Sequence, residues 1–329
     1  MKVRKKVLAL LLAAVTTLSM GVTAFATGGT GETTYTDQTT VTIKKEYVAA
    51  NADTTSPAET FTLVQVGDGK VTDGDAASAP ALGTITGAAF EAGDASTDGT
   101  VKNITITLPA YDRVGVYEYT LQEVAGTTAG VTYYGNTIRL VVTVMQGADG
   151  KIRVAGVHTE TEGEKKSDTF TNTYSAGTLN VSKTVEGNMG DHDKYFTFTV
   201  TLTGEEGKTY AESYAVTGGS NQSNPQTITI GTPATFYLKD GETISIANLP
   251  YNVSYAVTEA EANTNGYTTT PDGDTGTINA VSQTASFTNS KTGEVDTGIT
   301  LDTLPYILVF GLVMIAAVVM IVRRRRVED

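Results

Sequence analysis

The chain has 329 residues and a formal net charge of −13 at pH 7, a length that suits two domains and an acidity that argues against binding to nucleic-acid phosphates. It contains no cysteine and two histidines, which excludes disulfides, structural zinc and cysteine–histidine catalysis. We therefore expect no cofactor and no metal site.

Residues 1–26 have the layout of a secretory signal peptide. Four basic residues precede an apolar run over 7–15, and a small-residue cleavage site follows at 24–26. Residues 27–37 are rich in glycine and threonine and predict a flexible leader. Export would expose a strongly acidic chain, with 15 Lys and Arg against 34 Asp and Glu over 27–322, and this charge would keep it soluble.

Between the two ends, short runs alternate apolar and polar residues, and no long stretch has helical periodicity. This pattern predicts an all-β protein with two tandem β-sandwich domains, over 38–175 and 177–291. A stretch rich in Gly, Asp, Ala and Thr at 67–100 predicts a long surface excursion whose strands we do not assign. In the second domain, Asp240-Gly241 stands between two apolar runs and predicts a β-hairpin.

A lysine, a glutamate and an asparagine lie on the apolar faces of three predicted strands in the first domain. Lys45 ends the segment Val-Thr-Ile-Lys-Lys, Glu123 ends Tyr-Glu-Tyr-Thr-Leu-Gln-Glu, and Asn172 ends Phe-Thr-Asn. Strand side chains alternate between two faces, so Lys45 should face the same way as Val41 and Ile43. Burial of charged side chains is costly, which suggests that this triad has a chemical purpose.

The same pattern recurs in the second domain as Lys183, Glu259 and Asn289. The lysine-to-glutamate spacing is 78 residues in the first copy and 76 in the second, which indicates an internal duplication. Taken singly, each residue has an ordinary interpretation, such as a lysine whose amine reaches solvent from a strand. The constant order of the three residues, their inward strand phase and the repetition of the pattern together outweigh this ordinary interpretation. Lys44 is the nearest competitor of Lys45, but strand phase favours Lys45.

Such a triad can form a covalent cross-link. In an apolar core, desolvation lowers a lysine pKa and raises a glutamate pKa. A neutral Lys45 amine can attack the side-chain carbonyl carbon of Asn172, while a protonated Glu123 hydrogen-bonds that carbonyl and transfers protons. Ammonia leaves, and an isopeptide bond joins the first strand to the last. Proximity provides the driving force, and the second triad would react in the same way.

These segments resemble the Gram-positive pilin and adhesin domains that form such bonds spontaneously. Residues 38–175 resemble the streptococcal pilin isopeptide-linkage domain, and residues 177–291 resemble a CnaB-type immunoglobulin-like domain. The matching segments are Thr42–Lys45, Gly115–Glu123, Phe170–Thr173, Val181–Lys183, Tyr255–Glu259 and Phe287–Asn289. The resemblance implies a cell-surface protein that is not an enzyme, with Lys45–Asn172 and Lys183–Asn289 bonds promoted by Glu123 and Glu259. Asn252 departs from it, since glycine is usual there.

Residues 292–329 have the layout of a sortase sorting signal. The polar motif Glu-Val-Asp-Thr-Gly at 294–298 precedes an apolar span at 304–322 and four arginines at 323–326. The motif resembles LPxTG variants, in particular the EVPTG-like form of some streptococcal shaft pilins, but has aspartate in place of proline. The resemblance implies that a sortase cleaves between Thr297 and Gly298. The alternative is an ordinary single-pass anchor that is never cleaved.

The resemblance also implies an acceptor lysine shortly before the first-domain asparagine. Lys165 and Lys166 lie there, and the spacing favours Lys165; two solvated loop lysines are the alternative. The leading hypothesis is a wall-anchored pilus shaft subunit whose partners are a sortase, neighbouring subunits, peptidoglycan and, before sorting, the membrane. A monomeric wall-anchored adhesin or minor pilin that binds a host ligand is the alternative. No Ser-His-Asp or metal constellation supports an enzyme.

Overall fold

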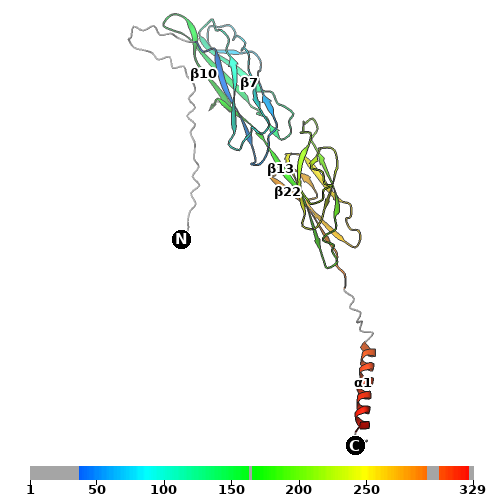
Figure 1. Ribbon diagram of the computed structural model, residues 1–329. Coiled ribbons are helices and arrows are strands. Elements are labelled where there is room, and N and C mark those ends of the chain that lie inside the picture. The colour runs from blue at the N-terminus through cyan, green and yellow to red at the C-terminus, as the bar shows by residue number, and fades with distance from the viewer. Residues whose placement is uncertain (1–36, 163–164, 295–303, 326–329) are drawn as a thin grey trace, which may run out of the picture.

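The computed structural model describes residues 37–162, 165–294 and 304–325 of the chain. Its strands form two bodies, residues 40–174 and 176–290, that lie end to end (Figure 1). The all-β prediction is confirmed, because sheets make up both bodies and the α-helix lies after them. The signal peptide, and the leader up to residue 36, lie outside the described residues.

The first body packs two main sheets. One has the strand order β6-β1-β12-β8 and the other β11-β10-β9-β7-β3, with β4 also paired to β7 and with β2 and β5 forming a separate pair. The bounds are β1 Thr40–Ala49, β2 Glu59–Phe61, β3 Leu63–Gln65, β4 Lys70–Gly74, β5 Ala88–Phe90, β6 Thr100–Thr107, β7 Gly115–Glu123, β8 Val131–Thr132, β9 Thr137–Gln146, β10 Ile152–Glu162, β11 Lys165–Lys166 and β12 Thr169–Tyr174. The stretch 67–100 thus contains two short strands, β4 and β5.

The second body repeats this plan. Its sheets have the orders β16-β15-β18-β13-β22-β20 and β17-β14-β19-β21. The bounds are β13 Ala176–Glu186, β14 Phe196–Thr203, β15 Tyr214–Gly218, β16 Thr227–Ile228, β17 Ala234–Leu238, β18 Thr243–Pro250, β19 Ser254–Glu259, β20 Thr268–Asp272, β21 Thr275–Thr277 and β22 Ser282–Ser290.

Each body has its own core, formed by the inward residues of alternating strands. Burying one face of each strand removes apolar area from water and determines which residues face inward. The first core includes Ile43, Tyr47, Phe61, Phe90, Ile104, Tyr117, Tyr119, Leu140 and Phe170. The second includes Leu179, Val181, Phe196, Phe198, Phe236, Ile244, Ile246, Val257 and Phe287.

The first and last strands of each body are neighbours. β1 pairs with β12 in parallel, with Tyr47 opposite Asn172. β13 pairs with β22 in parallel, with Val185 opposite Asn289. In both bodies the triad lysine therefore lies two positions before the residue opposite the asparagine, on the same face of the sheet.

The prediction of a β-hairpin at Asp240-Gly241 is wrong. β17 and β18 flank this turn but belong to different sheets, so the chain crosses from one sheet to the other there. Gly241 adopts the left-handed conformation that the turn needs, with φ of +73°. The Asp240 carboxylate accepts a hydrogen bond from the Val185 N–H at 2.7 Å, which ties the turn to β13.

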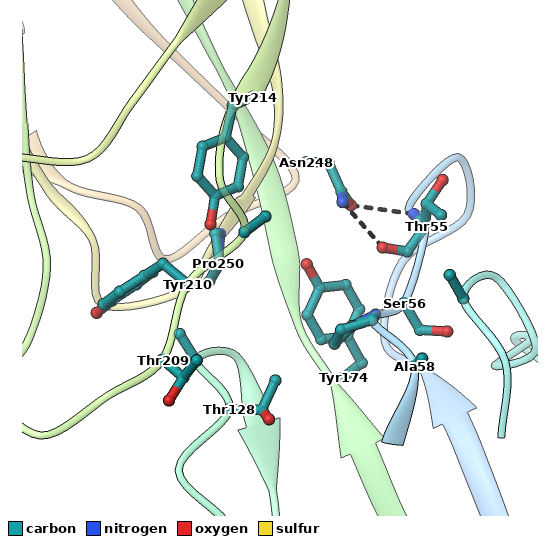
Figure 2. Close-up of a pocket in the computed structure, with 14 residues that line it drawn as sticks. Thr55, Ser56, Ala58, Thr128, Tyr174, Thr209, Tyr210, Tyr214, Asn248 and Pro250 are labelled. Carbon is teal, nitrogen blue, oxygen red and sulfur yellow. Dashed lines mark hydrogen bonds between the residues drawn. The ribbon is translucent and has the colours of Figure 1, made fainter. Parts of the chain in front are cut away.

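Polar contacts join the two bodies across a linker of one residue, Ser175, between β12 and β13. The Asn51 amide donates to the Ala176 carbonyl at 2.6 Å. Asn248 reaches the loop of the first body, where its amide accepts from the Thr55 N–H at 3.0 Å and donates to the Thr55 carbonyl at 2.8 Å (Figure 2). Tyr174 lies beside this contact in a pocket between the bodies.

The helix α1 covers Leu304–Arg325 and includes the apolar span expected at 304–322. By length and composition, Tyr306–Arg324 could cross a membrane, with a mean hydropathy of 2.6. Its described side chains are exposed, which agrees with a segment whose natural surroundings are lipid.

Candidate cross-linking sites

Strand phase separates the two adjacent lysines of β1 as expected. Lys45 is fully buried between the sheets. Lys44 points outward, with 38% of its side chain exposed, and pairs with Asp168 across the sheet at 3.0 Å. Of these two lysines, Lys45 is therefore the one whose amine lies in the core.

The three residues of the first triad meet in the core. The Lys45 Nζ atom lies 3.1 Å from Glu123 Oε1. The Asn172 amide nitrogen donates to the same oxygen at 2.9 Å. One carboxylate oxygen therefore lies between the amine and the amide nitrogen. All three side chains are buried.

A main-chain group completes this site. The Tyr134 N–H donates to Asn172 Oδ1 at 2.8 Å and to Glu123 Oε2 at 2.7 Å. Because a backbone N–H can only donate, it determines which end of the Asn172 amide is the oxygen. Glu123 thus faces the amide nitrogen, whereas the sequence-based prediction has it hydrogen-bonded to the carbonyl. A main-chain donor has no residue-type signal, so sequence reasoning could not find it.

Burial shifts Lys45 toward its neutral form. Burial lowers its pKa from 10.5 to about 8, and Glu123 opposes this shift only in part. The amine also lies over two aromatic rings, 3.9 Å from the centroid of Phe170 and 4.7 Å from that of Phe61, and these cation–π contacts favour the ammonium form, against the effect of burial. A pKa near 8 leaves an appreciable fraction of the amine unprotonated at neutral pH, as a nucleophile requires.

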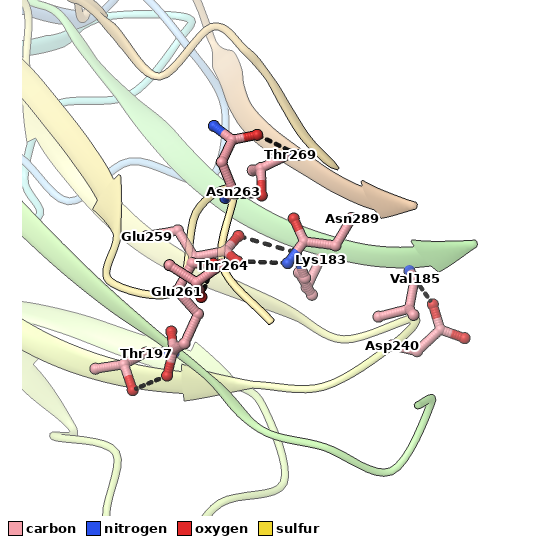
Figure 3. A network of polar contacts seen from close by, with 10 residues as sticks. All are labelled: Lys183, Val185, Thr197, Asp240, Glu259, Glu261, Asn263, Thr264, Thr269 and Asn289. Atoms are coloured by element: carbon pink, nitrogen blue, oxygen red, sulfur yellow. Dashed lines mark hydrogen bonds and ion pairs between the residues drawn. The ribbon is translucent and has the colours of Figure 1, made fainter. Parts of the chain in front are cut away.

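The second triad has a related geometry (Figure 3). Lys183 Nζ lies 2.9 Å from Glu259 Oε2, and the Asn289 amide nitrogen donates to Glu259 Oε1 at 2.5 Å. All three side chains are buried. Burial lowers the pKa of Lys183, while the hydrogen bond to Glu259 raises it. The Lys183 amine lies 4.2 Å from the centroid of the Phe196 ring.

The two sites differ at the asparagine carbonyl. Asn289 Oδ1 is buried and accepts no hydrogen bond from the part of the chain that the structure describes. Its neighbouring strand β20 forms a regular ladder with β22, with Thr269 opposite Asn289. The second site therefore has no counterpart of the Tyr134 donor among the described residues.

The two candidate acceptor lysines lie in a short edge strand, where the sequence suggested a loop. β11 pairs with β10, with Lys165 opposite Glu162 and Lys166 opposite Glu160, at one end of the sheet order. The Lys166 side chain is exposed. The predicted sortase cleavage point, Thr297 and Gly298, lies outside the described residues.

Comparisons with known proteins match both bodies of the chain. Residues 25–175 match the family described as a Spy0128-like isopeptide containing domain. Residues 177–291 match a domain of unknown function, DUF7601.

Two curated relatives come from Streptococcus pyogenes. A protein named Pilin, from serotype M1, is 32% identical over 235 residues, which cover 65% of this chain and 69% of that relative. The pilus tip adhesin Cpa is 35% identical over 130 residues, which cover 38% of this chain and 18% of the adhesin.

A solved structure has the same fold. The crystal structure of the major pilin from Streptococcus pyogenes aligns with a TM-score of 0.53 and 24% identity, and the alignment covers 78% of this chain and all of that chain. The all-β arrangement of two successive bodies is therefore one that a known pilin adopts.

Proposed function

The chain belongs to the family of the streptococcal pilin, and from this premise we propose that it is a pilus shaft subunit in which each of the two bodies is closed by a lysine–asparagine isopeptide bond. The bonds would join Lys45 to Asn172 and Lys183 to Asn289. A structural role of this kind needs no substrate pocket, and the only covalent chemistry the protein itself performs would be its own cross-linking.

One observation carries this proposal: Glu123 Oε1 contacts both the attacking and the leaving nitrogen, at 3.1 and 2.9 Å. The neutral Lys45 amine attacks Asn172 Cγ, and a new C–N bond forms there. The bond from Cγ to Nδ2 then breaks. Glu123 passes a proton from the attacking nitrogen to the leaving nitrogen, so that ammonia departs and the carboxylate is regenerated.

In the second body Glu259 also lies between the lysine and the asparagine, but each partner contacts a different carboxylate oxygen. Oε2 contacts Lys183, and Oε1 contacts Asn289. A proton taken up at one oxygen and delivered from the other completes the same exchange. The triads also replace the disulfides that a chain without cysteine cannot form.

The intact mass of the exported chain tests the cross-links. We expect it to be lower than the sequence mass by two molecules of ammonia. Lys45→Ala should restore the mass of one ammonia, and so should Glu123→Ala. Lys44→Ala is the matched control, because this lysine is adjacent but exposed, and both losses should persist. An unmodified mass in the unsubstituted chain would refute the cross-linking proposal for both bodies.

For assembly, we propose that a sortase cleaves after Thr297 and transfers its carbonyl to Lys165 or Lys166 of the next subunit, or to peptidoglycan at the base of the fibre. The sorting layout of motif, apolar helix and basic tail supports this step, and so does the position of β11 at a sheet edge. An edge strand leaves its outer side open to a neighbouring molecule. The precursor would span the membrane through α1 before cleavage.

Co-expression with the cognate sortase tests the acceptor. We expect a ladder of covalent polymers that resists SDS and disappears in the Lys165→Ala/Lys166→Ala double variant. Lys151→Ala, which removes a lysine elsewhere in the first body, should leave the ladder intact. A ladder that persists in the double variant would place the acceptor on another residue.

The alternative, a monomeric adhesin or minor pilin with a host ligand, is favoured less. The alignment with the relative named Pilin covers 65% of the chain, while that with the tip adhesin covers 38%. A chain that stays monomeric beside its sortase would revive this alternative.

A further inference from the structure

We infer that the main-chain N–H of Tyr134 activates the Asn172 carbonyl, so that the first cross-link forms through an oxyanion-stabilising contact that the described residues do not provide at the second. This inference rests on the proposed cross-linking function and adds a positioning group to it.

The Tyr134 N–H lies where negative charge would develop. When Lys45 attacks Cγ, the carbonyl double bond opens and Oδ1 becomes an oxyanion. The 2.8 Å bond from Tyr134 is already directed at that oxygen. Donors held at 2.7–3.1 Å from such an oxygen stabilise the transition state more than the ground state, since the charge on oxygen grows as the reaction proceeds.

The local fold explains why this N–H is available. β8 has two residues and pairs with β12 only at Val131–Tyr174 and Thr132–Thr173. The strand then leaves the ladder just beside Asn172. Tyr134 lies beyond the end of β8, and its N–H donates to the buried oxygens of Asn172 and Glu123. Its ring packs 5.4 Å from the Phe170 ring, which holds this segment in place.

The second body does not end its strand in this way. β20 is the spatial counterpart of β8, next to the last strand, and continues in register past Asn289 from Thr268 to Asp272. β20 stays paired with β22 along this stretch, and Asn289 Oδ1 has no donor in the described part of the chain. The proton transfer through glutamate is common to both sites, whereas the carbonyl contact belongs to the first.

The contact supplies no atom to the products. A bond forms between Lys45 Nζ and Asn172 Cγ, the oxyanion collapses, and Nδ2 leaves as ammonia with the proton relayed by Glu123. The Tyr134 hydrogen stays on its own nitrogen throughout. Removing it should slow the reaction without changing the product.

Two substitutions at one position separate the main-chain group from the side chain. Tyr134→Pro removes the N–H, and Tyr134→Ala keeps it while removing the ring. In freshly synthesised chains, ammonia loss at Lys45–Asn172 should be about 100-fold slower in the proline variant than in the alanine variant, the scale seen when one oxyanion donor is removed. Peptide mapping of the Lys183–Asn289 cross-link in the same molecules is the internal control, and its rate of formation should be the same in both variants.

A second measurement avoids the proline substitution, which could disturb folding of the first body. In the Lys45→Ala chain, which cannot react there, the Tyr134 amide hydrogen should exchange with solvent much more slowly than that of the adjacent, exposed Gly135. Equal exchange at the two residues would overturn the inference, and so would equal rates for the two Tyr134 variants. An unsubstituted chain that loses no ammonia would instead refute the cross-linking proposal itself.

Discussion

Lys45 and Lys44 show how one position along a strand changes the chemistry of a side chain. Both have the same covalent structure, but Lys44 is partly exposed beside Asp168, while Lys45 lies among aromatic rings with a pKa of about 8. Burial disfavours the ammonium form more than the ion pair with Glu123 favours it. The same burial that destabilises the unreacted protein would therefore prepare Lys45 as the nucleophile of the proposed cross-link.

This pKa predicts how the stability of the unreacted protein depends on pH. In Asn172→Ala, which retains Lys45 but cannot form the bond, the unfolded lysine (pKa 10.5) binds more protons than the folded one (about 8) between these two values. Stability should therefore rise with pH, by about 1 kcal/mol between about pH 7 and about pH 9. Urea unfolding at the two pH values measures it.

The double variant Lys45→Met/Asn172→Ala is the control for this measurement. It shares every other titrating group, including the tyrosines whose pKa burial raises, such as Tyr119 and Tyr214. The difference between the two variants isolates Lys45. If both variants respond to pH equally, the lysine is not desolvated as the structure indicates.

At the scale of elements, the junction between β12 and β13 decides whether the two bodies move as one rod. A linker of one residue restricts the relative motion of the two bodies, and the Asn248 side chain forms two hydrogen bonds to Thr55 of the first body. Asn248 has φ of +59°, a conformation that asparagine and glycine tolerate better than other residues. Asn248→Gly therefore removes the amide while keeping the backbone conformation.

We expect Asn248→Gly to widen the distribution of interdomain angles, measured as broader distance distributions in small-angle X-ray scattering. Asn263→Gly is the matched control, since Asn263 has φ of +56° and its side chain bonds to Thr269 within the second body. The control should leave the distribution unchanged. Indistinguishable profiles for the two variants would show that the Asn248 bonds do not stiffen the junction.

For the whole molecule, the two cross-links would close most of each body into a covalent loop. The closed loops span 127 positions in the first body and 106 in the second. If such a bond restricts the unfolded chain as a disulfide does, each contributes about 4–5 kcal/mol, and the nearly equal loop lengths predict nearly equal contributions. Force applied along the fibre would then be carried by the covalent bonds between the first and last strands of each body.

Removing one bond should weaken one body only. Lys183→Met keeps the volume of the side chain but removes the amine, and we expect the second body alone to melt earlier and to become sensitive to protease on heating. Lys45→Met should do the same to the first body. Calorimetry with mapping of the proteolytic fragments measures both. Loss of resistance in both bodies from a single substitution would mean that they do not unfold independently.

The sequence by itself determined what depends on local order along the chain. Period-two alternation selected Lys45 over Lys44, and short alternating runs predicted two all-β bodies, because inward and outward faces are encoded residue by residue. Only the tertiary structure decided which strands become neighbours. It placed the Asp240-Gly241 turn between two sheets, and it ended β8 beside Asn172 so that the Tyr134 N–H meets the carbonyl. A main-chain donor is present at nearly every residue, and only the path of the folded chain determines which one reaches a buried side-chain oxygen.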